Sequence, residues 1–436
     1  MKEQGPFQLF EVPKIVVAAY SESHMTTTAP VQPSSVPDTD AHRWTILALL
    51  SFVELLGMSV WFTAGATAPA LSARWQLDAG ATAMLTTVVQ LGFVVGTATA
   101  ALLNLADVLP ARRYLAVSAV CAAIANAALL IAPGYAFALV TRGFTGFFLA
   151  GVYPPAMKMA ATWFRSGRGL AIGTVVGALT IGKALPYLSS ALPGMEWQWV
   201  VTTSSIGALV AAALVAVGYR DGPFAFPQRR FSLRLLGTVL SDRPTRLAIG
   251  GYLGHMWELY AMWALSFLLL QAHFASRGIS GDQATMLAGA WAFGFIAIGA
   301  VGCVLAGAWA DRIGRENVAA LAMVVSGACA LAVGWLVGPS TWALVAVGLV
   351  WGFAVVADSA QFSALVTEVA PPHAVGTALT LQTSLGFLLT AASISLTIRL
   401  AETVGWGISC AQLAIGPALG IHAMIRLRSI RRHRLP

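Results

Sequence analysis

The chain has 436 residues, of which 58% are hydrophobic and only 10% are charged, and its net charge is +8. A soluble domain usually carries about 25% charged residues, so the composition excludes an ordinary water-soluble enzyme. The apolar residues suffice for twelve membrane-spanning helices of about 20 residues each. The four cysteines lie singly in apolar stretches, without the CxxC spacing of a metal or redox motif.

Residues 1–43 are predicted to form a disordered cytoplasmic tail, since they are polar and rich in Pro, Ser and Thr between 27 and 40. They contain no continuous apolar stretch of the kind that marks a signal peptide. Met25 begins a segment that would also suit the start of this tail. On that interpretation residues 1–24 are an upstream extension.

Twelve apolar segments are each long enough to cross the roughly 30 Å of hydrocarbon in a bilayer. The first six are predicted at residues 44–69, 81–103, 114–132, 136–161, 169–190 and 198–218. The other six are predicted at residues 247–271, 284–309, 317–337, 342–365, 376–397 and 405–425. All should be helices, because a spanning segment has to satisfy its own backbone hydrogen bonds, and none shows the alternation of a β-barrel strand.

The interval 219–246 contains three prolines and six arginines and separates the two sets of spans. We interpret it as a cytoplasmic linker between a bundle at 44–218 and a bundle at 247–425. Residues 426–436 are predicted to be a basic cytoplasmic tail.

The Lys and Arg residues are distributed unevenly among the connections. Twenty of the 26 fall in the tails, the linker and the loops on one side, three fall in the opposite loops, and three lie within spans. The positive-inside rule then places both termini in the cytoplasm of a multi-pass cell-membrane protein, which we expect to be a bacterial inner-membrane protein. Topology explains the basic charge, so no nucleic-acid partner is expected.

Two unrelated features repeat at the same interval. Glu54 in the segment ELLGM and Glu258 in ELYAM are 204 residues apart, and so are Asp107 and Asp311. Acidic residues are scarce in this chain, so the shared interval indicates an internal duplication. It predicts an all-α membrane protein whose twelve helices form two six-helix bundles related by a pseudo-twofold axis, the arrangement of alternating access.

The segment GAWADRIGRE at 307–316 resembles the loop signature GxxxDRxGR(R/K) of the major facilitator superfamily of transporters, departing at its last position. The first-half counterpart at 103–113 keeps the aspartate and the paired arginines but lacks both glycines. The segment RGFTG at 142–146 is similar to the RxxxG element of that family. The resemblance covers residues 44–425.

In that family these loops latch the two bundles together, and the resemblance implies the same role for eight residues here. They are Asp107, Arg112, Arg113, Gly307, Asp311, Arg312, Gly314 and Arg315. The alternative is that the arginines only satisfy the positive-inside bias.

An ionisable residue inside a span costs about 2.5–3.5 kcal/mol on insertion scales, so each one is a candidate functional residue. Glu54 and Glu258 are predicted about 15 Å deep, at the midplane, and Arg142 and Lys183 slightly outward of it. We expect Glu54, Arg142 and Lys183 to form an ionic cluster that responds to a proton or an anionic solute. The alternative is a structural salt bridge.

Further polar and aromatic side chains are expected along the pathway. His255 and Glu258 share a helix face, as do Asp358 and Gln361, and these four are candidate proton carriers and polar contacts. Gln90, Trp61 and Tyr153 are candidate pathway residues, with interhelical hydrogen bonding and simple packing as alternatives.

The segments at 53–62 and 150–164 resemble the nitrate/nitrite porter branch and its relatives. That branch holds its anion with an arginine in each of spans two and eight and carries a Gly/Asn signature in spans five and eleven. Here spans two and eight contain no basic residue and span eleven contains no Asn. Nitrate is therefore not the expected solute. Arg142 and Lys183 suit a small organic anion, and a proton-driven exporter of an apolar drug or metabolite is the alternative.

Two other protein classes were weighed, a channel and a membrane-embedded enzyme. The sequence contains no HExxH motif and no nucleophile and base pair at membrane depth, so no catalytic residue, metal or cofactor is expected. The expected partners are a small-molecule solute, protons and the lipid bilayer, with the protein as a monomer.

Overall fold

The computed structural model describes residues 41–164, 167–224 and 231–432, except for the side chains of Ala79, Ala106, Asp107 and Asp311. Residues 1–40 of the predicted tail at 1–43 lie outside the described residues. Every regular element in the described part of the chain is a helix. The helices of the first half are α2 (His42–Gly57), η1 (Met58–Val60), α3 (Thr63–Ala66), α4 (Ala68–Trp75), α5 (Ala79–Leu102), α6 (Leu105–Val108), α7 (Ala111–Ala127), η2 (Ala128–Ile131), α8 (Tyr135–Leu149), α9 (Tyr153–Ala161), α10 (Arg168–Ser190) and α11 (Trp197–Gly218).

The second half begins with two short helices in the predicted linker, and longer helices joined by 3₁₀ turns follow. They are η3 (Leu233–Leu235), α12 (Leu236–Ser241), α13 (Arg243–Ser276), α14 (Gly281–Ala297), α15 (Gly299–Ile313), α16 (Arg315–Val333), η4 (Gly334–Leu336), α17 (Thr341–Val355), α18 (Ser359–Val369), η5 (Pro372–Ala374), α19 (Val375–Val404), α20 (Trp406–Ala411), η6 (Gln412–Ala414) and α21 (Ile415–Arg432).

Twelve helical segments in the described residues are long and apolar enough to cross a membrane, and each overlaps one predicted span. The predicted all-α membrane fold is therefore confirmed. Two predicted boundaries differ from the structure. Helix α13 begins at Arg243, inside the predicted linker, and α21 continues through residues 426–432 of the predicted tail. Arg431 binds Glu316 at 2.8 Å and Glu368 at 3.0 Å, which holds the end of α21 against α16 and α18.

The first span is not the single helix predicted at 44–69. Helix α2 ends at Gly57, a 3₁₀ turn follows, and α3 begins only at Thr63. The carbonyl groups of Val60 and Trp61 accept hydrogen bonds from the Arg142 side chain, so a residue on another helix stabilises this break. The fourth span is interrupted in a similar way before α9, which carries two prolines in its first turn.

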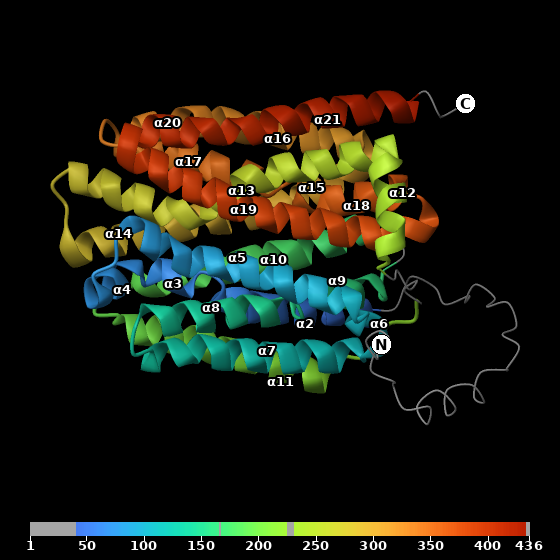
Figure 1. Cartoon of the computed structure of the whole chain (residues 1–436), viewed down its shortest axis with the longest axis horizontal. Helices are drawn as coiled ribbons and strands as arrows, with labels where there is room; N and C mark the ends of the chain where they lie inside the picture. The colour runs from blue at the N-terminus through green and yellow to red at the C-terminus, as the bar shows by residue number, and fades with distance from the viewer. Residues whose placement is uncertain (1–40, 165–166, 225–230, 433–436) are drawn as a thin grey trace, which may run out of the picture. The chain divides into compact units, whose positions relative to one another are not determined.

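The two halves meet mainly along three pairs of helices. Helix α10 packs along α14 and α15, and α5 packs along α19. In Figure 1 the blue-to-green helices of the first half lie below the yellow-to-red helices of the second half. The described helices all belong to one unit, residues 38–436.

Glycines bring α10 and α15 into close contact. A Cβ atom on Gly307 would lie 2.7 Å from the carbonyl oxygen of Gly169, and one on Gly173 would lie 2.8 Å from the carbonyl oxygen of Cys303. Small residues of this kind let backbones approach where no solvent drives association. The halves therefore touch backbone to backbone along this pair.

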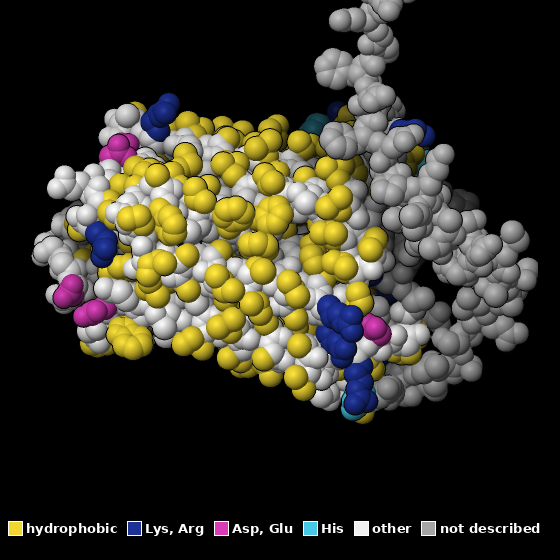
Figure 2. Space-filling model, turned by 60° about the horizontal axis from the view of Figure 1, so that its bottom comes forward, with side chains coloured by type: hydrophobic (Ala, Val, Ile, Leu, Met, Phe, Trp, Pro, Cys, Tyr) yellow, Lys and Arg dark blue, Asp and Glu magenta, His cyan; other side chains and the backbone are white. Residues whose placement is uncertain are grey.

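The outer surface suits a lipid environment. Large apolar side chains such as Val117, Ile124, Ile131 and Val217 are more than half exposed. Figure 2 shows hydrophobic side chains over the middle of the visible face, with charged side chains toward its two ends. We call the end with Arg112, Arg113, Arg312 and Arg315 the basic end. An apolar band bounded by charges is the pattern that a bilayer requires.

Candidate functional site

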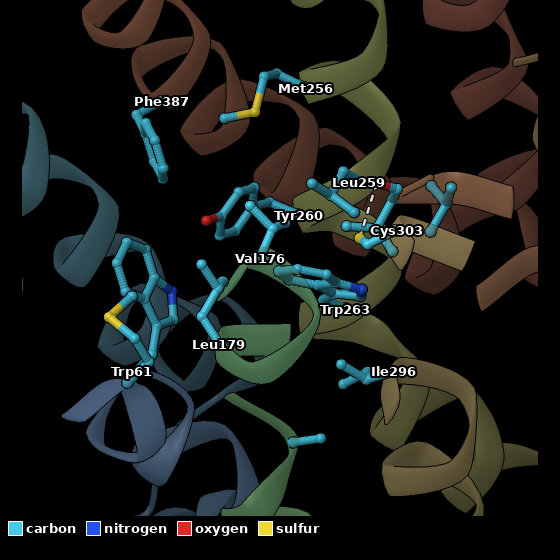
Figure 3. Close-up of a cluster of buried hydrophobic side chains, with 14 of the residues drawn as sticks. Trp61, Val176, Leu179, Met256, Leu259, Tyr260, Trp263, Ile296, Cys303 and Phe387 are labelled. Atoms are coloured by element: carbon cyan, nitrogen blue, oxygen red, sulfur yellow. Dashed lines mark hydrogen bonds between the residues drawn. The ribbon is translucent and has the colours of Figure 1, made fainter. Parts of the chain in front are cut away.

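A cluster of aromatic rings lies where the two halves meet. Trp61 and Phe93 come from the first half, and Tyr260, Trp263 and Phe387 from the second; we call these five the central aromatic cluster. Their ring centres are 5.1 Å apart for Trp61 and Phe93, 5.7 Å for Trp61 and Tyr260, and 4.4 Å for Phe93 and Phe387. Figure 3 shows Trp61, from the break between η1 and α3, approaching Tyr260 of α13 and Phe387 of α19. These rings close the junction between the two halves.

Lys183 of α10 lies against this cluster. Its ammonium group donates a hydrogen bond of 2.5 Å to the hydroxyl of Tyr260. The same nitrogen is 4.2 Å from the ring centre of Trp61 and 5.2 Å from that of Trp263, within the range of cation–π attraction. The charge of Lys183 is thus held by rings from both halves.

Glu54 of α2 is fully buried, and neither of its carboxylate oxygens has a hydrogen-bond partner among the described residues. Its charge interacts electrostatically with that of Lys183, but the two do not form an ion pair within 4 Å in the described structure. Tyr153, at the start of α9, is half-buried and also lies within electrostatic range of Glu54. Glu54 is therefore a buried acid with neither a hydrogen-bond partner nor an ion-pair partner among the described residues.

Arg142 does not join the predicted ionic cluster. Its guanidinium donates to the carbonyl of Val60 at 3.1 Å, to that of Trp61 at 2.5 Å, and to the side-chain oxygen of Asn126 at 2.6 Å. These acceptors satisfy both terminal nitrogens of the guanidinium, because the broken first span leaves carbonyl groups without helical partners. The Nε–H has no acceptor among the described residues. The expectation that Arg142 pairs with Glu54 is therefore wrong, and Arg142 instead positions Trp61.

Glu258 occupies the position in the second half that corresponds to Glu54, but its surroundings differ. One carboxylate oxygen accepts from the indole N–H of Trp351 at 2.7 Å, and the other from the hydroxyl of Ser326 at 2.7 Å. Both oxygens are thus occupied by groups of the second half. The duplication preserved the acid and not its partners.

Replacing Glu258 by glutamine should lower the free energy of unfolding by about 1–2 kcal/mol. The amide oxygen can still accept from Trp351, but the amide nitrogen cannot accept the hydroxyl proton of Ser326. The bond from Ser326 to a carboxylate is then replaced at best by a neutral bond from the amide N–H to the hydroxyl oxygen, which is weaker. Thermal and denaturant unfolding of the purified protein in detergent measures the change. The matched variant Glu54→Gln removes no hydrogen bond and should unfold like the wild type. Equal destabilisation of the two variants would contradict this account.

His255 and Asp358 form a second buried pair. The Nδ1 atom of His255 is 2.8 Å from a carboxylate oxygen of Asp358, and both side chains are almost fully buried. The Nε2 atom of His255 has no partner among the described residues. His255 thus pairs with the connection between α17 and α18, although the sequence groups it with Glu258 on one helix face.

Two predicted pathway residues are engaged elsewhere. The amide of Gln361 accepts from Arg315 at 2.9 Å, which places it at the basic end. The amide of Gln90 is buried and faces the carbonyl groups of Thr86 and Thr87 on its own helix. Neither contact involves Glu54 or Lys183.

The predicted latch residues lie at the basic end. Gly314 has a φ of +89°, which favours glycine and lets α15 turn into α16. Arg315 binds Glu368 at 2.7 Å, a partner within the second half, whereas Gly307 contacts the first half through Gly169. Arg112, Arg113 and Arg312 are exposed, and the side chains of Asp107 and Asp311 lie outside the described residues.

Sequence reasoning did not single out Phe93, Tyr260 or Phe387. A signal for Tyr260 was present in the repeat, because ELLGM has Leu56 where ELYAM has Tyr260. A polar ring that replaces an aliphatic residue beside a repeated acid marks a departure from the duplicated pattern. No metal-binding group of three His, Cys, Asp or Glu residues occurs within the described ranges.

Comparisons with known proteins agree with this architecture. The profile described as "Major Facilitator Superfamily" matches residues 47–394. The chain is 26% identical over 236 residues to "MFS transporter asaE" of Aspergillus flavus, a match that covers 52% of this chain and 50% of that protein. The match thus spans about half the length of this relative.

Two solved structures have a similar fold. Both are of a bacterial homologue of the human lysosomal transporter Spinster in an inward-facing conformation. The unoccupied one has a TM-score of 0.63 at 13% identity and covers 89% of this chain and 95% of its own. The occupied one has a TM-score of 0.61 at 14% identity and covers 88% and 94%. At these identities the likeness shows the fold alone.

Proposed function

The chain belongs to the Major Facilitator Superfamily, and from this premise we propose that it is a secondary active transporter that moves a small organic solute by alternating access, coupled to protons. The single observation that carries the coupling is Glu54, a fully buried acid with no hydrogen-bond partner among the described residues, beside the junction of the two halves. The structural contacts described above supply the rest of the argument.

Alternating access requires two halves that move against each other around a central site. The contacts of α10 with α14 and α15, and of α5 with α19, are the surfaces that slide or part. The central aromatic cluster fills the space between them. Its rings separate on the side that opens and close behind the solute.

Proton coupling follows from the cost of burying charge. An ionised carboxylate in an apolar interior is expensive unless it is paired, and a protonated one is far less so. Glu54 lacks such a pair, so binding or loss of a proton changes the energy of the closed arrangement. Opening the site to water on one side and then the other lets Glu54 exchange its proton with both compartments.

An organic solute suits the site better than nitrate. The nitrate/nitrite branch that the sequence resembles uses arginines in spans two and eight, and α5 and α14 contain no basic residue here. A proton-driven exporter of an apolar drug or metabolite is the second candidate, and the central aromatic cluster favours it. The direction of proton-driven flux in liposomes of known orientation distinguishes uptake from export.

We place the protein in the cell membrane of a bacterium, with the basic end and both termini in the cytoplasm. The excess of Lys and Arg on one side supports this orientation. Protease access to a tag fused to the C-terminus, in right-side-out and inverted vesicles, tests it.

The test of coupling begins with a thermal-shift screen of the purified protein against organic anions, cations and drugs. A solute that stabilises the protein is then followed into proteoliposomes with an imposed pH gradient. We expect the gradient to accelerate wild-type flux. Glu54→Gln should abolish that acceleration while leaving solute exchange without a gradient.

The control is Glu402→Gln, which removes an exposed carboxylate at the end of α19. Its flux should respond to the gradient like the wild type. Wild-type flux that ignores the pH gradient, or a Glu54→Gln variant that keeps the wild-type response, refutes proton coupling through Glu54.

A further inference from the structure

The buried charges near the junction of the halves differ in what they can still bind. Arg142 is surrounded by carbonyl acceptors, Glu258 has two donors, and His255 is paired with Asp358. Lys183 is different, because its ammonium group has three N–H donors and Tyr260 is the one hydrogen-bond acceptor that the described residues provide. In Arg142 only the Nε–H lacks an acceptor among the described residues, so Lys183 is the buried cation with more donors to spare.

Resting on the transport function proposed above, we propose that this site takes organic monoanions with a flat aromatic or apolar body. The anionic group of the solute binds the ammonium of Lys183, and the body lies among the rings of the central aromatic cluster. By the same geometry, uncharged analogues bind the wild-type site more weakly, and organic cations are repelled from it by Lys183.

The charge of Lys183 favours an anionic solute. The ammonium of Lys183 is held by the faces of Trp61 and Trp263, and these cation–π contacts substitute for the anion that a buried cation normally requires. A solute carboxylate would replace them with a charge-assisted hydrogen bond, which is stronger than a neutral one. The ammonium of Lys183 thus lacks an anionic partner, which the anionic group of the solute supplies.

The rings of the central aromatic cluster favour a solute with a flat body. Trp61 and Phe93 of the first half lie against Tyr260 and Phe387 of the second, with ring centres 4.4–5.8 Å apart. Planar solutes stack favourably on such rings in offset or edge-on arrangements. A small inorganic anion would leave these faces without a partner once they separate, whereas an aromatic acid covers them.

Glu54 limits the number of negative charges that the solute can carry. The nearest buried acid with no committed partner is Glu54, which repels a second negative charge on the solute. One anionic group matches one ammonium, and a proton on Glu54 leaves the loaded site neutral. A neutral site is the cheapest one to carry through an apolar interior. Dianions are therefore poor solutes.

The test measures binding to the purified full chain by thermal shift and by titration calorimetry. The probes are benzoate and indole-3-acetate, their uncharged amides benzamide and indole-3-acetamide, and the cation tryptamine. Wild-type protein should bind the two acids at least about 10-fold more tightly than their amides, and should not bind tryptamine.

Lys183→Gln should weaken binding of the two acids at least about 10-fold and leave binding of the amides unchanged. It also removes the tethered ammonium from the rings, so tryptamine should become a ligand. Lys183→Arg keeps the charge and should bind the acids more tightly than Lys183→Gln does. The matched control is Lys158→Gln, a lysine of α9 that should leave all affinities unchanged.

Three results overturn the proposal. The first is a wild-type protein that binds acids and amides with equal affinity. The second is a wild-type protein that binds tryptamine more tightly than the acids, and the third is a Lys183→Gln variant that loses no affinity for the acids. If Lys183→Gln fails to fold, the affinities of the wild type and of Lys183→Arg for the acids and for their amides still test the proposal. Failure here leaves proton coupling intact, because the coupling test uses whichever solute the broad screen identifies. Conversely, acid binding without gradient-driven flux refutes the transport mechanism and keeps this site.

Discussion

Replacing Arg142 by leucine is expected to lower the free energy of unfolding by about 3–5 kcal/mol and to abolish transport. The change leaves the carbonyl groups of Val60 and Trp61 and the side-chain oxygen of Asn126 without their donor inside an apolar interior. Each buried acceptor without a partner costs about 1–3 kcal/mol. The break between α2 and α3 then loses the group that holds it, and Trp61 moves.

Denaturant unfolding in detergent and the yield of folded protein after purification measure this effect. Arg142→Lys is the informative companion, because it keeps the charge but its single nitrogen cannot reach all three acceptors in the same way. It should recover part of the stability. A leucine variant with wild-type stability and flux would show that the break in the first span needs no guanidinium.

Replacing Gly307 by alanine should reduce flux at least about 10-fold while leaving the protein folded. The new methyl group would lie 2.7 Å from the carbonyl oxygen of Gly169, which is backbone and cannot swing aside. Overpacking of this kind typically costs about 1–3 kcal/mol. Helices α10 and α15 then part at the basic end, and the closed arrangement becomes less populated.

Native Cys303 reports this separation. It lies one helical turn before Gly307, is buried, and its carbonyl contacts the Gly173 position of α10. In a Cys121→Ser background, labelling of Cys303 by N-ethylmaleimide should be faster in Gly307→Ala than in the parent. Gly294→Ala is the control, since its methyl group meets only ordinary contacts beginning at 3.8 Å. Unchanged labelling and flux in Gly307→Ala would contradict a tight closure at this point.

These two changes act on different features of the same mechanism. Arg142 supports the position of Trp61 within the first half, whereas Gly307 determines how closely the second half approaches α10. Because they are far apart in the fold and share no partner, their effects on unfolding should add. Their effects on flux need not, since both change the population of the closed state.

The sequence by itself determined the membrane class and the twelve spans. The free energy of inserting a span depends on the residues of that segment alone, so hydropathy and length suffice to find it. The same local cost marked Glu54, Lys183 and Glu258 as unusual. For these features no knowledge of neighbouring helices was needed.

Only the tertiary structure decided which of the buried charged side chains have hydrogen-bond partners. Trp351 lies 93 positions from Glu258, and Val60 lies 82 positions from Arg142, so these partners depend on how each helix is rotated in the bundle. Two equivalent positions of a repeat, Glu54 and Glu258, thereby acquired opposite surroundings. Helix periodicity sets which residues share a face, but packing between helices decides what that face meets.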